Sequence, residues 1–267
     1  MSSNSLKHER AKGVAWVRPL RYFWRLPLLL LHVFLGLSAT VLTIVFVGDR
    51  IRIGEESLHH TMIRWWSGLL CRVFGVRIEH SGQPAPGPVL MVANHLSWLD
   101  IEVIQAERAA SFVGKAEIRS WPFIGWLASL GGTVFLQRGS GNSSGNAVEV
   151  MRDSLLAGRT MAIFPEGRTG RGDRVLPFHG RLLQAAIEAN CPVQPVAIRY
   201  AREGQKTVSP AFAEGETFVA NVWRVLGDPP SVAEVHYLPP ITPDRQGRRE
   251  MINKARDAIV KVVDYIG

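Results

Sequence analysis

The chain has 267 residues, of which 46% are hydrophobic and 20% are charged, and its formal net charge at pH 7 is +8. This length and this apolar share exclude a disordered chain and allow one large domain with a buried core. The two cysteines, Cys71 and Cys191, are too few for a disulfide framework or a zinc cluster. The positive charge favours an acidic partner, which can be a nucleic acid, an anionic membrane or a phosphorylated small molecule.

The N-terminal segment predicts an association with a membrane. The uncharged run 26–47 would be about 33 Å long as a helix, which matches the hydrocarbon thickness of a bilayer. A buried core helix is the less favoured alternative, because the run has no polar face. Residues 1–25 hold one acid, Glu9, and six basic side chains, namely Lys7, Arg10, Lys12, Arg18, Arg21 and Arg25.

The orientation of this segment has two possible solutions. The N-terminal bases predict an N-terminus on the inner side of the membrane, so a single full crossing would place residues 50–267 outside. Either the run enters the membrane and returns as a helical hairpin with the apolar stretch 65–76, or the charge rule fails here. We favour the hairpin, which does not cross the bilayer.

The rest of the chain predicts alternating strands and helices. After a turn-rich linker at 81–88, we expect strands at 89–94, 111–114, 133–136, 160–164, 193–200 and 233–238. We expect helices from Ser97 onward, after the cap Asn146 as far as Gly158, at 181–189 and at the C-terminus. This alternation predicts one α/β layered domain over 81–267, with a mostly parallel central sheet flanked by helices, behind a membrane-associated helical segment 1–80.

The stretch ANHLSWLD at 93–100 places His95 and Asp100 five residues apart. In an unbroken helix these two side chains would not share a face. The spacing from Ser97 to Asp100 is that of a capping pair, however, and predicts that the helix begins at Ser97. His95 then lies in the preceding loop, where Asp100 can fix the imidazole tautomer and leave the other ring nitrogen as a general base. A histidine beside an ordinary helix cap is the alternative.

Basic residues follow two further predicted strands. Arg138 comes between an apolar strand and a glycine-rich loop, where it can either bind a phosphate or remain solvated. The segment FPEGRTGRGDR begins at the end of strand 160–164, and ligands bind at such strand ends in open α/β sheets. Its backbone N–H groups, the Thr169 hydroxyl and Arg168 suit a phosphoryl group. Glu166 would orient an arginine or accept a substrate hydroxyl.

These stretches together resemble the lysophospholipid acyltransferase family, and within it the bacterial 1-acylglycerol-3-phosphate acyltransferases. The resemblance covers residues 75–200 and is specific because four motifs occur in the family's order. His95 and Asp100 match the H-x4-D motif, Phe135 to Arg138 the aromatic-x-x-Arg block, Phe164 to Gly167 the F-P-E-G block, and Pro195 the proline block.

One departure concerns the third block. The block of the family continues with Thr-Arg, whereas this sequence reads Arg168 and then Thr169. In the family the arginine helps to hold the phosphate of the acceptor. Arg168 therefore performs that role from the neighbouring position, or the acceptor has another head group. A lyso-ornithine lipid or another lysolipid stays open as the acceptor.

The resemblance implies a membrane-bound O-acyltransferase of phospholipid biosynthesis that needs no metal and no cofactor. His95, oriented by Asp100, would take the proton from the free hydroxyl of lysophosphatidate. That hydroxyl would attack the thioester of acyl-CoA or acyl-carrier protein and give phosphatidate. Backbone N–H groups near Ser97 would stabilise the oxyanion. The acceptor would be bound by Arg138, Glu166, Gly167, Arg168 and Thr169.

The family also implies a place and a set of partners. The catalytic part would face the cytoplasm at a bacterial inner membrane, where it meets the acyl donor, the lysophospholipid acceptor and the bilayer, and no nucleic acid is expected. A serine hydrolase is a rival, because GNSSG at 141–145 matches a nucleophile-elbow pattern around Ser143. No apolar strand directly precedes that pattern, which favours a chance match. A non-enzymatic basic membrane-binding protein would explain the charge but not the four ordered motifs.

Overall fold

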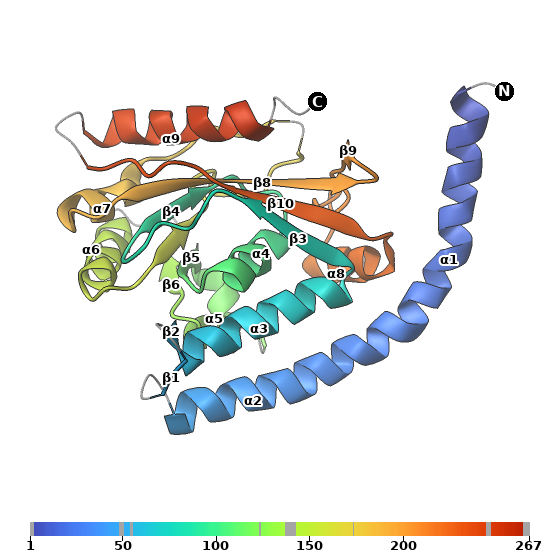
Figure 1. Ribbon diagram of the computed structural model, residues 1–267, viewed down its shortest axis with the longest axis horizontal. Coiled ribbons are helices and arrows are strands. Elements are labelled where there is room, and N and C mark those ends of the chain that lie inside the picture. Colours follow the sequence, from blue (N-terminus) through green and yellow to red (C-terminus); the bar gives the residue numbers. More distant parts are fainter. Residues whose placement is uncertain are drawn as a thin grey trace.

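The computed structural model describes residues 3–47, 51–53, 56–122, 124–136, 143–172, 174–243 and 247–263. Its centre is an eight-stranded sheet in the order β3-β10-β8-β4-β7-β5-β6, with β9 paired to β8 (Figure 1). The strands are β3 (Val76–Ser81), β4 (Leu90–Ala93), β5 (Ser111–Lys115), β6 (Val134–Leu136), β7 (Met161–Ile163), β8 (Val193–Arg202), β9 (Gln205–Lys206) and β10 (Ser231–Tyr237).

The sheet is mostly parallel, as predicted. β4 pairs in parallel with both β7 and β8, and β5 pairs in parallel with β7 and β6. Only the pairs of β8 with β10 and β9 are antiparallel in the described part of this sheet. Because β4, β7, β5 and β6 run in the same direction, the loops that follow them emerge at one edge of the sheet.

Helices cover both faces of the sheet. On one face α9 (Arg248–Val263), α6 (Ser143–Leu156) and α7 (Gln184–Glu188) bury Leu90 and Val92 of β4. On the other face α3 (Leu58–Val73), α4 (Leu99–Glu107) and α8 (Phe218–Gly227) bury Met91 and Ala93. A strand covered on both faces needs a continuous apolar sequence, which is why the run 89–94 predicted β4 correctly. The short elements are η3 (Ala116–Ser120), α5 (Ile124–Leu130) and η4 (Arg181–Leu183).

Four elements differ from the sequence prediction. α4 begins at Leu99 rather than Ser97, and α6 begins at Ser143 rather than after Asn146. β3 was not predicted, because it is the edge strand and most of its side chains are exposed, so the apolar signal is weak. α8 was not predicted either, although its apolar side packs against the core through Val225 and Leu226.

The N-terminal segment forms one long helical rod followed by a return helix. The rod consists of α1 (Ser3–Leu31), η1 (His32–Gly36), α2 (Leu37–Leu42) and η2 (Thr43–Val47), where η1 and η2 are π-helical turns. After the short strands β1 (Arg52–Ile53) and β2 (Glu56–Ser57), α3 runs back beside the rod (Figure 1). The Trp66 ring of α3 stacks on His32 at 4.0 Å between centroids, which fixes the two arms of the hairpin.

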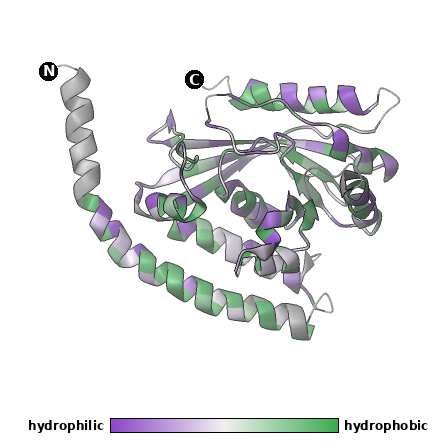
Figure 2. Ribbon diagram, turned by 180° about the vertical axis from the view of Figure 1, so that it is seen from behind, coloured by the Kyte–Doolittle hydropathy of each residue, from purple (hydrophilic) through white to green (hydrophobic). Residues whose placement is uncertain are grey.

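The outer surface of this rod is strongly apolar. Phe23, Phe34 and Phe46 are 81%, 73% and 71% exposed. Figure 2 shows the hydrophobic colouring continuing along most of the lower rod. Residues Val17–Ala39 are long and apolar enough to cross a membrane. An exposed apolar surface of this size indicates membrane association.

Basic side chains of α1 fasten the rod to the end of α8. Arg25 is only 1% exposed and donates to the backbone carbonyl oxygens of Leu226 at 2.9 Å and Asp228 at 2.8 Å. Tyr22 donates to the carbonyl of Trp223 at 3.0 Å, and the two rings stack. The last carbonyl groups of a helix lack partners within it and carry partial negative charge, so cationic donors stabilise them.

Candidate active site

The loop between β4 and α4 carries the predicted histidine and aspartate. The Nδ1 atom of His95 lies 2.9 Å from Oδ2 of Asp100, with Asp100 in the first turn of α4. The sequence prediction of this pairing is confirmed. His95 follows directly on Asn94, whose side chain exchanges two hydrogen bonds with the backbone of Ile198 on the neighbouring β8. The histidine loop is therefore fixed to the central sheet.

Asp100 is fully buried, and both of its oxygens accept hydrogen bonds. Oδ2 accepts from the backbone N–H groups of Leu96 at 2.6 Å and Ser97 at 2.8 Å, in addition to His95. Oδ1 accepts from the Tyr200 hydroxyl at 2.8 Å. Burial, followed by the charge of Asp100, raises the pKa of Tyr200 well above its usual value, so the phenol remains a donor. An ionised carboxylate only accepts, so Nδ1 of His95 carries the proton and Nε2 holds a lone pair.

These contacts correct one expectation about the oxyanion. The backbone N–H groups near Ser97 were expected to face the substrate. The N–H groups of Leu96 and Ser97 instead point inward to Asp100, so these two cannot also stabilise an oxyanion. These N–H groups turn toward Asp100 because a buried carboxylate is stable only when hydrogen-bond donors compensate its charge.

The imidazole of His95 has a defined orientation. Its ring stacks on Phe164 at 3.9 Å between centroids and with an angle of 13° between planes. Phe164 follows β7 directly, so a neighbouring parallel strand supplies the support for the ring. Of the His95 side chain, 16% is exposed. This arrangement can supply a general base that a substrate reaches from outside.

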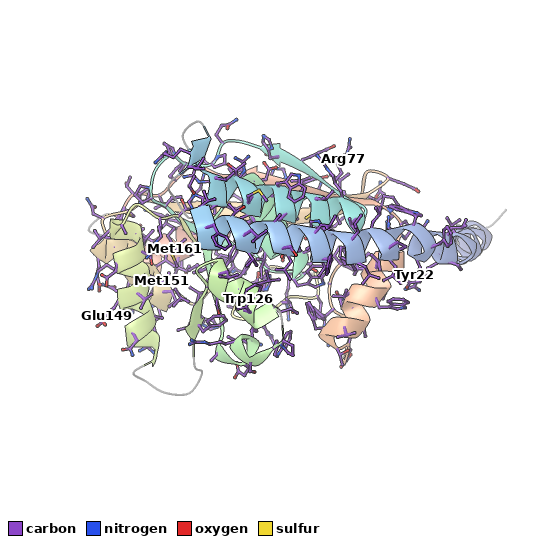
Figure 3. All side chains as sticks on the ribbon, turned by 90° about the horizontal axis from the view of Figure 1, so that it is seen from below. Tyr22, Arg77, Trp126, Glu149, Met151 and Met161 are labelled. Atoms are coloured by element: carbon purple, nitrogen blue, oxygen red, sulfur yellow. The ribbon has the colours of Figure 1, made fainter. Side chains whose placement is uncertain are left out.

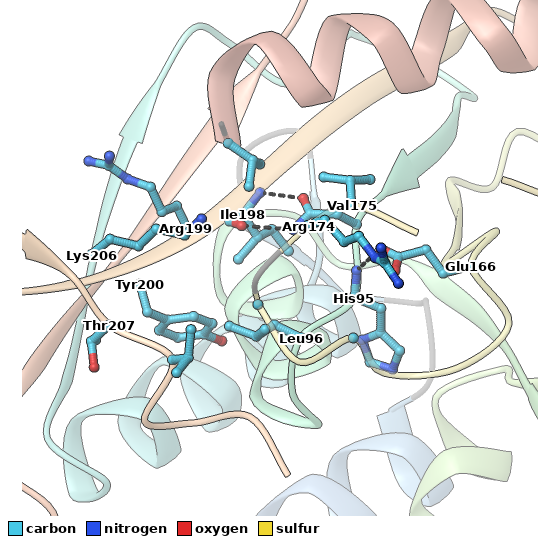
Figure 4. Close-up of a pocket in the computed structure, with 15 residues that line it drawn as sticks. His95, Leu96, Glu166, Arg174, Val175, Ile198, Arg199, Tyr200, Lys206 and Thr207 are labelled. Carbon is cyan, nitrogen blue, oxygen red and sulfur yellow. Dashed lines mark hydrogen bonds between the residues drawn. The ribbon is translucent and has the colours of Figure 1, made fainter. Parts of the chain in front are cut away.

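The carboxylate of Glu166 joins the histidine loop to the loop after β7. Oε1 accepts the backbone N–H of His95 at 2.8 Å, and Oε2 accepts the backbone N–H of Leu176 at 3.2 Å. The backbone N–H of Gly170 in turn donates to the carbonyl of His95 at 2.7 Å. Burial raises the pKa of Glu166 to about 7, against the opposing effect of the two N–H donors. Figure 4 shows Tyr200 and Glu166 approaching the segment of His95 and Leu96 from opposite sides.

The remaining predicted residues surround this loop. Gly167 and Arg168 are exposed and Thr169 is half-buried, and all three lie between Phe164 and Gly170 in the loop after β7. Arg138 lies outside the described residues, as do 137–142 as a whole. β6 ends at Leu136, at the same edge of the sheet as β4 and β7. The side chain of Ser143 also lies outside the described residues.

A small cavity lies behind the histidine loop. Its volume is about 20 Å³, and its lining includes Glu166, Arg199 and Lys206. This size suits a single water molecule and excludes a lipid or a thioester. In Figure 4 the His95 ring is turned away from Arg199 and Lys206.

Tyr200 is the residue of the site that the sequence prediction missed. It is the last residue of the predicted strand 193–200 and lies near the carboxyl end of β8. β8 pairs in parallel with β4, so its later residues lie beside the loop that carries His95. A phenol at the end of a buried strand next to a buried carboxylate was the available signal.

Comparisons with known proteins agree with this geometry. A protein-family model described as Acyltransferase matches residues 76–199. A lyso-ornithine lipid O-acyltransferase of Pseudomonas aeruginosa is 37% identical over 202 residues, which are 76% of this chain and 78% of that protein. A 1-acyl-sn-glycerol-3-phosphate acyltransferase of Neisseria meningitidis is 35% identical over 64% of this chain and 68% of that protein. The chain belongs to the acyltransferase family.

The fold of this acyltransferase also has a solved counterpart. The crystal structure of the 1-acyl-sn-glycerophosphate acyltransferase PlsC from Thermotoga maritima superimposes with a TM-score of 0.62 and 21% identity. The match covers 91% of this chain and 97% of that one, so it includes most of the N-terminal hairpin as well as the sheet. The acyltransferase therefore combines a PlsC-like fold with the His95 and Asp100 pair at the carboxyl end of β4.

Proposed function

We propose that this O-acyltransferase moves a fatty acyl group to the free hydroxyl of a lyso-ornithine lipid. The observation that carries the proposal is the similarity to the Pseudomonas aeruginosa lyso-ornithine lipid enzyme over about three quarters of both chains. A Brucella abortus protein of the same name is 40% identical over half of this chain. Lysophosphatidate is the second candidate acceptor, supported by the Neisseria meningitidis relative and by the four sequence motifs.

The head-group loop gives a second reason for this preference. The order Arg168-Thr169 departs from the Thr-Arg of lysophosphatidate acyltransferases. Ornithine is an amino acid, so its lipid presents a carboxylate and an amine but no phosphate. A guanidinium binds a carboxylate in the same bidentate manner as a phosphate. The exposed Arg168 and the half-buried Thr169 are our candidates for this contact, together with Arg138 and Gly167.

The mechanism follows from the protonation state of His95. The free Nε2 atom takes the proton of the acceptor hydroxyl. At the same time the oxygen of that hydroxyl attacks the thioester carbonyl of acyl-CoA or acyl-carrier protein. Asp100 stabilises the imidazolium, since its Oδ2 already accepts from Nδ1. The carbon–sulfur bond then breaks, and the imidazolium returns the proton to the thiolate that leaves. Glu166 acts in this mechanism as a positioning residue, because it holds the backbone of His95.

The hairpin has a role in delivering the acceptor. We infer that the rod and α3 associate with one leaflet of a bacterial inner membrane without crossing it. Two observations support this arrangement, namely the exposed phenylalanines of the rod and the antiparallel return of α3. The catalytic part begins at the edge strand β3, five residues before the predicted boundary at 81, and then faces the cytoplasm, where acyl-CoA and acyl-carrier protein are present.

A purified-enzyme assay tests the proposal. The full chain in detergent is offered lyso-ornithine lipid or lysophosphatidate, each with acyl-CoA and with acyl-carrier protein, and products are identified by mass. We expect kcat/KM for lyso-ornithine lipid to exceed that for lysophosphatidate by at least about tenfold, which corresponds to 1.4 kcal/mol. The reverse preference would establish the second candidate. Absence of turnover with every pair would favour a non-enzymatic membrane-binding protein.

A further inference from the structure

A groove outside the active site runs along α3. Its volume is about 770 Å³, and it is walled by α3, by the first residues of β3 and by the end of α4. α4 has nine residues and begins beside His95, so its far end lies roughly 13 Å along the helix from the catalytic pair. The groove is therefore distinct from the site described above.

The lining of the groove combines apolar and basic side chains. Leu69 of α3 and the β3 residues Val76 and Ile78 are apolar, and Arg64, Arg72 and Arg77 are basic. Trp65, at 51% exposure, stands beside the arginines. On α3 the spacing 61, 64, 68, 72 places the lining residues along one stripe of the helix.

The charge of the lining is positive. Against its three arginines stands one acid, Glu107, whose Oε2 lies 2.8 Å from Nδ1 of His80. Arg77 pairs with Glu79 next to the groove, and 74% of its side chain is still exposed. Arg72 is exposed and has no ion pair within the described part of the chain. A polar anion next to an apolar tail is the chemistry that this lining fits.

The groove lies on the flank of the membrane-associated hairpin. Figure 3, seen from below, shows α3 beside the rod, and Arg77 lies at the border of the same face. α3 packs on the rod through Trp66, and the same rod carries the exposed phenylalanines. The helix α9, by contrast, covers the opposite face of the sheet (Figure 1).

From these observations we propose that the α3 groove binds an anionic phospholipid of the surrounding leaflet. The phosphate is held among Arg64, Arg72 and Arg77, and an acyl chain lies over Leu69, Val76 and Ile78. This lipid is a ligand that retains the enzyme at anionic membranes, not an acyl acceptor. The proposal rests on the membrane association inferred under the proposed function.

Vesicle binding by the full chain tests the groove. Phosphatidylcholine vesicles with and without phosphatidylglycerol are compared for the wild type, for Arg72→Gln/Arg77→Gln and for the control Arg248→Gln/Arg249→Gln on α9. The control loses the same charge on the other face of the sheet. We expect the preference for phosphatidylglycerol to fall about tenfold in the groove variant and less than about twofold in the control. Equal losses in both variants would show a general charge effect and overturn the proposal.

Two further measurements separate the possible causes. Millimolar glycerol phosphate should leave the preference of the wild type for phosphatidylglycerol vesicles unchanged. If glycerol phosphate abolished this preference, the groove would bind a free phosphate compound instead of a lipid. Turnover of lysolipid in detergent should be the same in the groove variant and the wild type. If the groove variant shows normal turnover and an undiminished preference for phosphatidylglycerol vesicles, the lipid site in the groove is overturned and the proposed function stands. Failure of the wild type to bind either vesicle overturns the membrane association and the groove together.

Discussion

Oε1 of Glu166 accepts the backbone N–H of His95 at 2.8 Å, so the loop after β7 holds the loop after β4. Oε2 of the same carboxylate accepts the N–H of Leu176, whose carbonyl accepts from Arg256 on α9. One buried acid thereby links three segments of the chain around the candidate base.

Glu166 should give the fold a pH dependence. Burial raises its pKa in the folded protein to about 7, above the usual value near 4.5. Because the pKa of Glu166 is higher in the folded chain than in the unfolded chain, its protonation stabilises the fold. This contribution is complete below the pKa of the unfolded chain, near 4.5, and is lost as the pH rises through 7. We expect thermal unfolding in detergent to show a loss on the order of 3 kcal/mol between pH 4.5 and pH 8. Glu166→Gln should flatten this window, whereas the exposed Glu149→Gln should retain it. An unchanged slope in Glu166→Gln would contradict the assignment.

Tyr200→Phe should lower activity without dismantling the site. The substitution removes the only donor that the described structure gives to Oδ1 of Asp100. A carboxylate oxygen left buried without a donor costs about 1–3 kcal/mol, so we expect kcat to fall several-fold and the melting temperature to drop. Tyr237→Phe is the matched control, because the buried Tyr237 hydroxyl has no partner among the described residues. Equal effects of the two substitutions would mean that the Asp100 contact has no role.

Gly172→Ala should disturb the histidine loop from behind. Gly172 has φ +79°, and a Cβ atom there would lie 2.5 Å from Val208 and 2.8 Å from the Leu96 side chain, next to His95. Gly158 has a similar φ of +82° but open space around it. Both alanine variants should lose about 1–2 kcal/mol of stability, because alanine is strained at a positive φ. Only Gly172→Ala should also lower kcat, and a steady-state comparison of the two variants measures this difference. Equal activity in both would show that the loop tolerates the displacement.

Arg25→Met should loosen the attachment of the rod. It leaves the carbonyl groups of Leu226 and Asp228 without a buried cationic donor, at a cost of about 2–4 kcal/mol. Limited proteolysis in detergent should then cleave near α8 faster than in the wild type. Arg249→Met, on the exposed side of α9, serves as the control and should be cleaved at the wild-type rate. An unaltered cleavage rate in Arg25→Met would show that α1 is held by other contacts.

Much of the fold could be predicted from the sequence because its central strands are buried on both faces. The apolar runs at 89–94 and 193–200 have few other structural solutions. β3 escaped prediction for the opposite reason, since Arg77, Glu79 and His80 on this edge strand give it the composition of a loop. The predicted helix starts differ from the observed ones by two residues in α4 and four in α6.

In the site, the pairing of His95 with Asp100 was predictable from the sequence, whereas the contact of Tyr200 with Asp100 was not. A loop histidine five residues before a carboxylate can only pair with it if the helix begins between them, and the spacing from Ser97 to Asp100 indicated that start. Contacts to the backbone could not be predicted in this way. The N–H groups of Leu96, Ser97 and His95 carry no sequence signal, so neither their inward direction nor the positioning role of Glu166 could be derived.

The most direct test of the account is the turnover of His95→Ala with lyso-ornithine lipid and an acyl thioester, followed by mass. The account predicts a loss of at least about a thousandfold in kcat, with a melting temperature and vesicle binding close to those of the wild type, because the ring contributes the proton transfer rather than the fold. Turnover within tenfold of the wild type, in a folded and membrane-bound variant, would contradict it.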